Sequence, residues 1–222
     1  ERIKINGKDI SKAGFAKMIG RIRSVIESRY SLKELPTEFE LLTAAAFLYF
    51  AEEKVDIAVI ETGLGGRLDS TNMLKPAVCA ITNIDLDHCA VLGGTLSSIA
   101  KEKAGIIKRG VPVVTACDKP AAIRVIRAVC AKKGARLIRV SASLVRSDKR
   151  GTTLDMRAGQ KRLKAVRLHF RGAYQAANAA VSLGILSELR SKGFVISEKA
   201  LRQGFLSARW PARFQVVQKK PL

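Results

Sequence analysis

The sequence of 222 residues is poor in several residue types, and each shortage narrows what the chain can be. Aromatic residues are few (eight phenylalanines, three tyrosines and one tryptophan), which argues against a dedicated nucleic-acid-binding surface. No apolar run reaches the length of about 18 residues that a membrane-spanning helix needs, so we expect no membrane partner. The four cysteines show no C-x-x-C spacing; we interpret them as reduced, mainly buried thiols of a cytoplasmic protein.

Acidic residues are also in short supply, with 19 Asp and Glu against 40 Lys and Arg, for a net charge of +21. Such a field attracts polyanions, so a basic α/β domain that binds nucleic acid or another polyanion without catalysis is one hypothesis. Against it, the basic residues are spread along the chain, and their densest stretch, 146–167, is interrupted by Asp148 and Asp155. An anionic small substrate explains the charge equally well, and we expect no specific nucleic-acid partner.

Strand-like and helical patterns alternate along the chain, which predicts an α/β fold with a mostly parallel sheet and flanking helices. A hairpin is expected at 2–10, with a turn at Asn6-Gly7, and Thr37 with Glu40 matches a capping box. Three alternating segments between 144 and 170 predict a small antiparallel sheet added to the core. Helices are expected over 11–29, 37–54, 95–103, 120–132, 174–191 and 197–206, and further strands over 55–60, 77–84, 111–116 and 135–140.

Both ends of the printed sequence resemble the interior of a longer chain. The sequence opens in a strand-like run at 2–5 and closes directly after another one. We therefore expect an internal segment of a longer protein, with a central domain over 1–208 and a linker, followed by the start of a further domain, over 209–222. We expect this protein to be a monomer.

The most informative stretch is the glycine loop, residues 61–72, which reads E-T-G-L-G-G-R-L-D-S-T-N and follows the apolar segment 55–60. Open α/β sheets bind ligands at the carboxyl ends of their strands, so this mixture of glycines and charges favours a phosphate and metal site. Glu61 is either a ligand of that site or a residue paired with Arg67. A dinucleotide fingerprint fits poorly, because the third glycine is missing and no helical period follows.

Two further segments could carry chemistry. Asp85-Leu86-Asp87-His88 follows the strand expected at 77–84, and its histidine could be a metal ligand, a general base or a hydrogen-bonded loop residue. Lys101 and Lys103 stand near the end of an expected helix, where spacing alone favours solvated residues that suit the helix dipole.

Several segments, in order along the chain, resemble the folylpolyglutamate synthase/dihydrofolate synthase family of the Mur ligase superfamily. They are P-T-E-F-E-L-L-T-A-A-A-F at 36–47, the glycine loop, I-T-N-I-D-L-D-H at 81–88, I-A-K-E-K-A-G-I-I-K at 99–108, Y-Q-A-A-N-A-A at 174–180 and R-W-P-A-R-F-Q at 209–215. This resemblance covers nearly the whole chain and implies the central ATP-binding domain of a Mur ligase, a fold of the P-loop type.

The resemblance also implies a reaction. The family uses ATP to join L-glutamate to dihydropteroate or to a folate through an acyl phosphate. Charge gathers on the transferred phosphoryl group, so catalysis rests on positioning and on charge neutralisation by Mg²⁺, which prefers hard oxygen ligands.

Site residues follow from the resemblance position by position. Lys103 matches a carbamylated lysine, a modification that turns an ammonium into an anionic oxygen ligand, and with His88 it is expected to be catalytic. The expected magnesium ligands are Glu61, His88 and carbamylated Lys103; the ATP contacts are Asn178 and Arg213; and the substrate contacts are Phe39, Leu68, Asp69 and Ser70.

The chain departs from the family pattern in two respects that affect activity. The sequence contains no Gly-x-x-Gly-Lys-Ser, the loop with which the family binds the phosphates of ATP. A serine-bearing loop that supplies another magnesium contact is also absent. We therefore expect residues 1–222 by themselves to be inactive.

Overall fold

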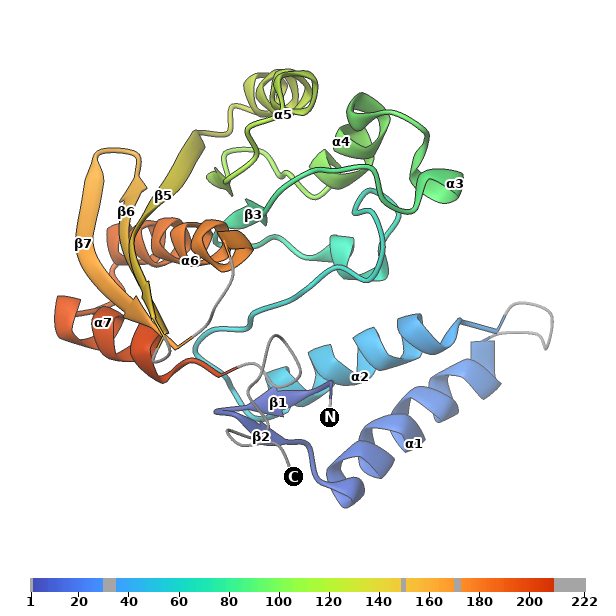
Figure 1. The fold of residues 1–222 in the computed structure, drawn as a ribbon. Coiled ribbons are helices and arrows are strands. Elements are labelled where there is room, and N and C mark those ends of the chain that lie inside the picture. The colour runs from blue at the N-terminus through green and yellow to red at the C-terminus, as the bar shows by residue number, and fades with distance from the viewer. Residues whose placement is uncertain (1, 30–34, 149–150, 170–172, 210–222) are drawn as a thin grey trace, which may run out of the picture. The chain divides into compact units, whose positions relative to one another are not determined.

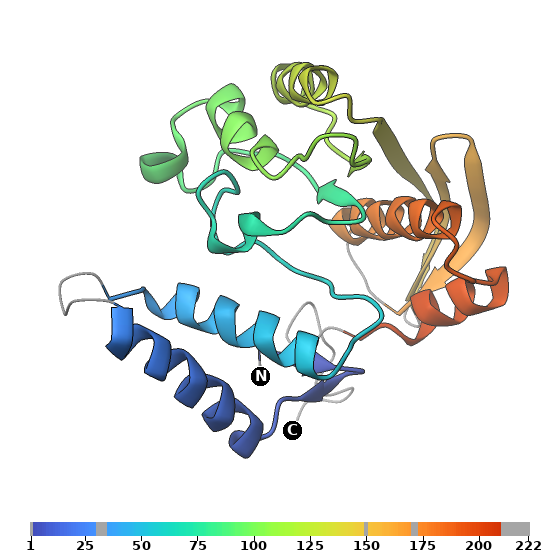
Figure 2. The same ribbon diagram turned by 180° about the vertical axis from the view of Figure 1, so that it is seen from behind.

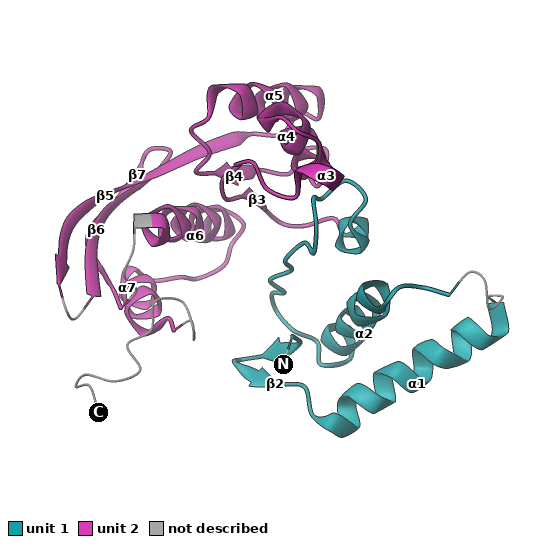
Figure 3. Cartoon of the chain, turned by 45° about the vertical axis from the view of Figure 1, so that its right-hand side comes forward, with its two compact units in different colours: residues 1–74 teal, residues 75–222 magenta. Residues whose placement is uncertain are grey.

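The computed structural model describes residues 2–29, 35–148, 151–169 and 173–209. The chain divides into two compact units, residues 1–74 (unit 1) and 75–222 (unit 2), coloured separately in Figure 3. The expected domain bounds, 1–208 and 209–222, stay a prediction. No helix in the described ranges combines the length and the apolar character that crossing a membrane requires.

Unit 1 begins with the expected hairpin. Strands β1 (Lys4–Ile5) and β2 (Lys8–Asp9) pair antiparallel, and the turn residues Asn6 and Gly7 both have positive φ, at 51° and 77°. Two residues with positive φ make the turn whose twist matches that of the strands it joins, and Asn-Gly is the dipeptide that adopts it most readily.

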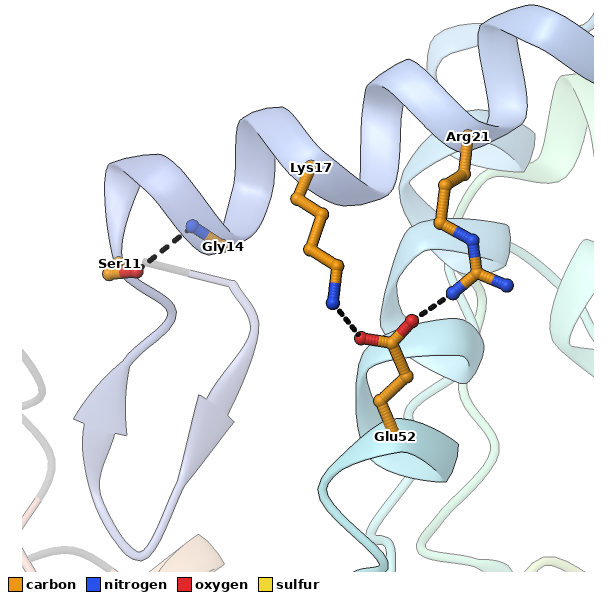
Figure 4. A network of polar contacts seen from close by, with 5 residues as sticks. All are labelled: Ser11, Gly14, Lys17, Arg21 and Glu52. Atoms are coloured by element: carbon orange, nitrogen blue, oxygen red, sulfur yellow. Dashed lines mark hydrogen bonds and ion pairs between the residues drawn. The ribbon is translucent and has the colours of Figure 1, made fainter.

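Two helices complete the regular structure of unit 1, namely α1 (Lys12–Arg29) and α2 (Glu38–Glu52), which lie side by side in Figures 1 and 2. Buried Met18 and Ala45 lie at the centre of their contact. Glu52 of α2 links the helices by accepting from Lys17 Nζ at 2.8 Å and from the Arg21 guanidinium (Figure 4). Ser11 Oγ accepts from the amide of Gly14 at 3.0 Å at the start of α1.

The start of α2 confirms the capping box expected from the sequence. Thr37 Oγ1 accepts from the amide of Glu40 at 3.3 Å, and Glu40 Oε2 accepts from the amide of Thr37 at 2.7 Å. These bonds satisfy amides that a helix leaves without intrahelical partners, so the first turn of α2 is fixed by its own sequence.

Unit 2 is built on one five-stranded sheet in the order β3-β4-β5-β6-β7. Strands β3 (Cys79–Ile81), β4 (Val113–Thr115) and β5 (Leu137–Asp148) run parallel, and β6 (Gly151–Ala158) and β7 (Lys161–Leu168) continue the sheet antiparallel. The α/β class is confirmed. The expected antiparallel addition is continuous with the parallel strands, because β5 belongs to both parts.

Helices cover both faces of this sheet. Fully buried neighbours on β4 show the alternation: Val113 packs in a cluster with α4 (Leu96–Ala104) and α5 (Pro120–Lys132), and Val114 packs in a cluster with α6 (Ala173–Ser191). Short α3 (Cys89–Leu92) precedes α4, and α7 (Glu198–Ser207) packs against β7 (Figure 1). Cys79, Cys117 and Cys130 are buried, Cys89 is exposed and all four are free thiols, as expected.

One expected strand is wrong. Residues 55–60, interpreted from their apolar composition as a buried parallel strand, form no strand, and Val59 is 92% exposed. A strand exists through hydrogen bonds to a neighbour, and β1 and β2 are the strands among the described residues of unit 1. These two strands pair only with each other, so neither of them is a hydrogen-bonded neighbour of 55–60. Apolar composition without such a neighbour does not make a strand.

Helix α6 approaches the sheet closely at Gly184, which gives a test of this packing. A Cβ atom at Gly184 would lie 2.6 Å from Val114 Cγ1 and 2.9 Å from Val140 Cγ1. We expect Gly184→Ala to lower the free energy of unfolding by about 1–3 kcal/mol through overpacking, measured by urea denaturation.

Gly204 of α7 supplies the matched control, because a Cβ atom there meets nothing within 4 Å. Gly204→Ala should raise the free energy of unfolding by up to about 1 kcal/mol through helix propensity. Equal effects of the two substitutions would contradict the close approach of α6 to the sheet.

Candidate functional site

The glycine loop is organised around Asp69. Asp69 Oδ2 accepts from the amides of Gly63 at 2.8 Å and Leu64 at 3.0 Å, and Oδ1 accepts from the amide and the hydroxyl of Thr71 at 3.0 and 2.5 Å. The carboxylate therefore joins the start of the loop to the 3₁₀ turn η1 (Ser70–Met73), of which Asp69 is the N-cap. Three backbone amides and one hydroxyl of the same segment therefore hold the loop through this carboxylate.

The surroundings of Asp69 favour its charged form. Burial by itself would raise the pKa of this carboxyl, but the hydrogen bonds from Thr71, Leu64 and Gly63 outweigh burial and hold the pKa below its ordinary value. Asp69 is therefore a carboxylate at neutral pH, with two donors on each oxygen.

Helix α2 contributes an aromatic ring to the same place. A Cβ atom at Gly63 would lie 2.6 Å from Phe39 Cζ, so only glycine lets the ring pack against the loop in this way. One turn further along α2, Thr43 Oγ1 lies 3.0 Å from Ser70 Oγ. The structure thus brings together three of the expected substrate contacts, Phe39, Asp69 and Ser70.

The fourth expected substrate contact, Leu68, lies on the same loop with 80% of its surface exposed. An apolar side chain presented to solvent on the loop against which Phe39 packs suits a partly apolar ligand. Sequence reasoning missed the part played by Thr71 and Thr43. The Asp-x-Thr pattern at 69–71 is a local signal for a capping carboxylate and could have indicated the first of them.

The three expected magnesium ligands are divided between the two units. Glu61 opens the loop in unit 1 and is exposed, whereas His88 and Lys103 lie in unit 2. Among the described residues no group of three or more His, Cys, Asp or Glu side chains could hold a metal ion. Lys103 carries no oxygen ligand until it is carbamylated, so its place in a magnesium site stays a prediction.

His88 is in an unusual backbone conformation. Its φ of 50° and ψ of 37° are left-handed, and it stands at the N-cap of α3 without using its side chain as a cap. The exposed imidazole has Nε2 3.7 Å from Asp87 Oδ2, a contact that is an ion pair only when the histidine is protonated. A left-handed non-glycine residue often marks a functional position. The side chain is free to bind a ligand.

Lys103 lies in the last turn of α4 and is half buried, with Ala104 beside it and Ala100 three residues before it both fully buried. Its neighbour on the same helix, Lys101, is exposed. The two lysines that spacing alone did not distinguish therefore differ in environment. In donor chemistry, Glu61 supplies the oxygen that a magnesium ion prefers, His88 supplies a nitrogen, which magnesium prefers less, and Lys103 supplies an oxygen only after carbamylation.

Of the two expected ATP contacts, Asn178 and Arg213, only Asn178 lies among the described residues. Asn178 is exposed near the start of α6, and its Nδ2 donates to Gln175 Oε1 at 3.4 Å. Arg213 lies outside the described residues. An exposed amide is available to a ligand, so the assignment of Asn178 stays a prediction.

Comparison with known proteins finds one matching family and similar proteins in other organisms. Residues 8–186 match the family described as the Mur ligase middle domain. The whole chain aligns with a dihydrofolate synthase/folylpolyglutamate synthase of Bacillus subtilis at 39% identity and with a folylpolyglutamate synthase of Lacticaseibacillus casei at 34%. It covers 53% and 54% of these proteins, so the chain spans about half the length of the curated relatives it matches.

Solved structures give the same result. A complex of a folylpolyglutamate synthase with AMPPCP superposes with a TM-score of 0.91 at 33% identity, over 100% of this chain and 56% of that one. The folylpolyglutamate synthase of Thermotoga maritima gives a TM-score of 0.86 at 34% identity, over 97% of this chain and 50% of that one.

Proposed function

Because the chain belongs to the Mur ligase family through a middle domain that spans residues 8–186, we propose that the protein containing it is an ATP-dependent ligase. Its substrates are L-glutamate and dihydropteroate, a folate, or both. The observation that carries this proposal is the alignment of the whole chain with dihydrofolate and folylpolyglutamate synthases at 31–39% identity. Similar solved structures include folylpolyglutamate synthase complexes with AMPPCP and with AMPPCP and folate, which supports a site for both kinds of ligand.

The proposed reaction has two steps. A carboxylate oxygen of the pterin substrate attacks the γ-phosphorus of ATP, and ADP leaves with the electrons of the broken P–O bond. The amine of glutamate then attacks the acyl carbon, phosphate leaves and the amine loses one proton. Positioning and charge neutralisation account for most catalysis of phosphoryl transfer, so the protein needs fixed loops and a cation site.

Residues of this chain would supply part of the cation site and part of the fixed loops. Glu61, His88 and carbamylated Lys103 would hold Mg²⁺, which when bound neutralises charge on the phosphoryl oxygens. Phe39, Leu68 and Ser70 would contact the pterin substrate. Each oxygen of Asp69 already accepts two hydrogen bonds, which supports a role in holding the loop beneath that substrate. Asn178 and Arg213 would contact ATP. We expect the protein to be cytoplasmic and monomeric.

Ligation assays on the full-length protein test the proposal. We expect mass spectrometry to show a product that carries one more glutamate, formed only when ATP, Mg²⁺ and glutamate are all present. Separate assays with dihydropteroate and with tetrahydrofolate identify the acceptor. Residues 1–222 alone should show no turnover, because their sequence lacks a Gly-x-x-Gly-Lys-Ser loop. Failure of the full-length protein with every pterin acceptor would contradict the proposed function.

Glu61→Gln should lower the ligation rate on the order of 10²-fold and raise the Mg²⁺ concentration needed for half-maximal rate. The amide keeps the shape of the carboxylate but loses the charge that attracts the cation. Glu53→Gln is the matched control, because Glu53 is also exposed in unit 1 but lies at the C-cap of α2. An unchanged Mg²⁺ dependence in Glu61→Gln would exclude Glu61 as a ligand.

A further inference from the structure

A groove of about 840 Å³ lies at the start of β5, within unit 2, and none of the site residues discussed above lines it. Its walls are the first residues of β5, the turn between β6 and β7, and the second half of α6. Through β4, residues 137–139 of β5 are level with residues 79–81 of β3, so the groove, named here the β5 groove, extends along the whole parallel part of β5.

The charged side chains of the β5 groove are mainly cationic. Its lining includes Arg136, Arg139, Arg157 and Lys161, all exposed, and one acid, Glu188. The Glu188 side chain is only 10% exposed, and its Oε2 accepts from an Arg136 guanidinium nitrogen at 2.5 Å. That ion pair neutralises one of the four cations. The positive charge of the other three exceeds the negative charge that the lining supplies.

Strand register places two of these cations, Arg139 and Arg157, on one face of the sheet, whereas Lys161 is level with Ala158 and lies on the other face. Arg157 of β6 is directly opposite Ser141 of β5 on one side and Arg162 of β7 on the other. Arg139 is two residues before Ser141 and so points to the same face. The nearest acid of β6 on this face, Asp155, accepts from the amide of Ala165 at 2.8 Å. Like charges directly opposite each other destabilise a sheet, and a bound anion would relieve that repulsion.

We propose that the β5 groove binds a small polyanion, about the size of a nucleotide, that carries two or more phosphate or carboxylate groups. Its volume falls in the usual range for small-ligand sites, about 300–1,000 Å³. Guanidinium groups bind both phosphate and carboxylate in a bidentate manner. The lining also offers Ser141, Gln160 and Ser187 for hydrogen bonds and no aromatic side chain for base stacking, which favours a small ligand over single-stranded nucleic acid. This site goes beyond the proposed ligase function.

Calorimetric titration of the purified protein with inorganic tripolyphosphate and with a triglutamate peptide tests the proposal, at a salt concentration near 0.15 M to screen the general field. We expect saturable binding of one molecule of at least one probe. The double variant Arg139→Gln/Arg157→Gln should weaken it about tenfold or more, a change of about 1.4 kcal/mol or more in the free energy of binding, because two charged donors are lost. Comparison of the probes distinguishes phosphate from carboxylate recognition.

Helix α5 supplies a control of equal charge. Arg124 and Arg127 are exposed there, outside the groove, so Arg124→Gln/Arg127→Gln removes the same net charge. This variant should keep the affinity of the unmodified protein within about twofold, as expected for distant and exposed sites. Equal losses in the two double variants, or no saturable binding of either probe, would overturn the proposal.

Circular dichroism melting shows whether each variant folds. If Arg139→Gln/Arg157→Gln does not fold, Lys161→Gln at the exposed start of β7 replaces it, and an unchanged affinity in that variant would equally overturn the proposal. Duplex DNA is the third probe. Tighter binding of DNA than of either small probe, lost in Arg139→Gln/Arg157→Gln alone, would show that the groove serves a nucleic acid and would refute the small-ligand assignment.

Discussion

Replacement of Lys103 by alanine should lower the ligation rate of the full-length protein by a factor on the order of 10²–10³, the usual effect of removing one group that stabilises transition-state charge. Lys103 is half buried in the last turn of α4. A carbamate there would lie at the negative end of the helix dipole, which favours a cation. A bound Mg²⁺ would offset this unfavourable interaction, so we expect incorporation of labelled bicarbonate to rise with Mg²⁺.

Three further variants and conditions make this result specific. Lys103→Arg keeps the positive charge but cannot be carbamylated, so it should be as inactive as Lys103→Ala. Added acetate should restore part of the activity of Lys103→Ala by supplying a carboxylate oxygen. Lys101→Ala, on the same helix but exposed, should keep its rate within about twofold. Near-normal activity in Lys103→Arg would refute the carbamate.

Asp69→Asn should have the second largest effect. The isosteric amide has one acceptor oxygen, so donors that now share the two oxygens of Asp69 lose their partner: the amides of Gly63 and Leu64, or the two groups of Thr71. We expect the free energy of unfolding to fall by about 2–3 kcal/mol. Displacement of the loop should lower kcat/KM for the pterin substrate by a factor on the order of 10–10².

The pH dependence of this effect has a defined sign. The pKa of Asp69 is lower in the folded protein than in the unfolded chain, so the carboxylate adds stability above the unfolded value of about 4. That contribution is lost as the pH falls through the lower, folded pKa. The difference in unfolding free energy between the natural protein and Asp69→Asn should therefore be constant from neutral pH to about 4 and shrink below it.

Asp56→Asn is the matched control, since Asp56 is an exposed carboxylate of the same unit. Urea denaturation of the two variants over this pH range measures both predictions. A destabilisation that is the same in Asp56→Asn, or that does not diminish in acid, would show that the hydrogen bonds of Asp69 do not hold the loop.

The helix starts and turns whose formation depends on residues close in the sequence were predicted correctly. Thr37, Thr95 and Ser197 begin helices through side-chain bonds to amides three residues later, and each start was expected from the sequence. Helix α5 has the expected bounds, Pro120–Lys132. The hairpin turn at Asn6-Gly7 follows from backbone freedom at these two positions. Such features are decided within about four residues, so the sequence contains all of their causes.

The sequence by itself determined the α/β class, the helix starts, the identity of the glycine loop and, through resemblance, the family. Only the tertiary structure decided that 55–60 is not a paired strand, that β5 joins the parallel and antiparallel strands into one sheet, and that the β5 groove collects arginines from β5 and β6. It also showed that both oxygens of Asp69 are occupied by backbone and hydroxyl donors. The physical reason is that strand pairing, side-chain burial and charge clustering depend on residues far apart in the chain, which become neighbours only when the chain folds.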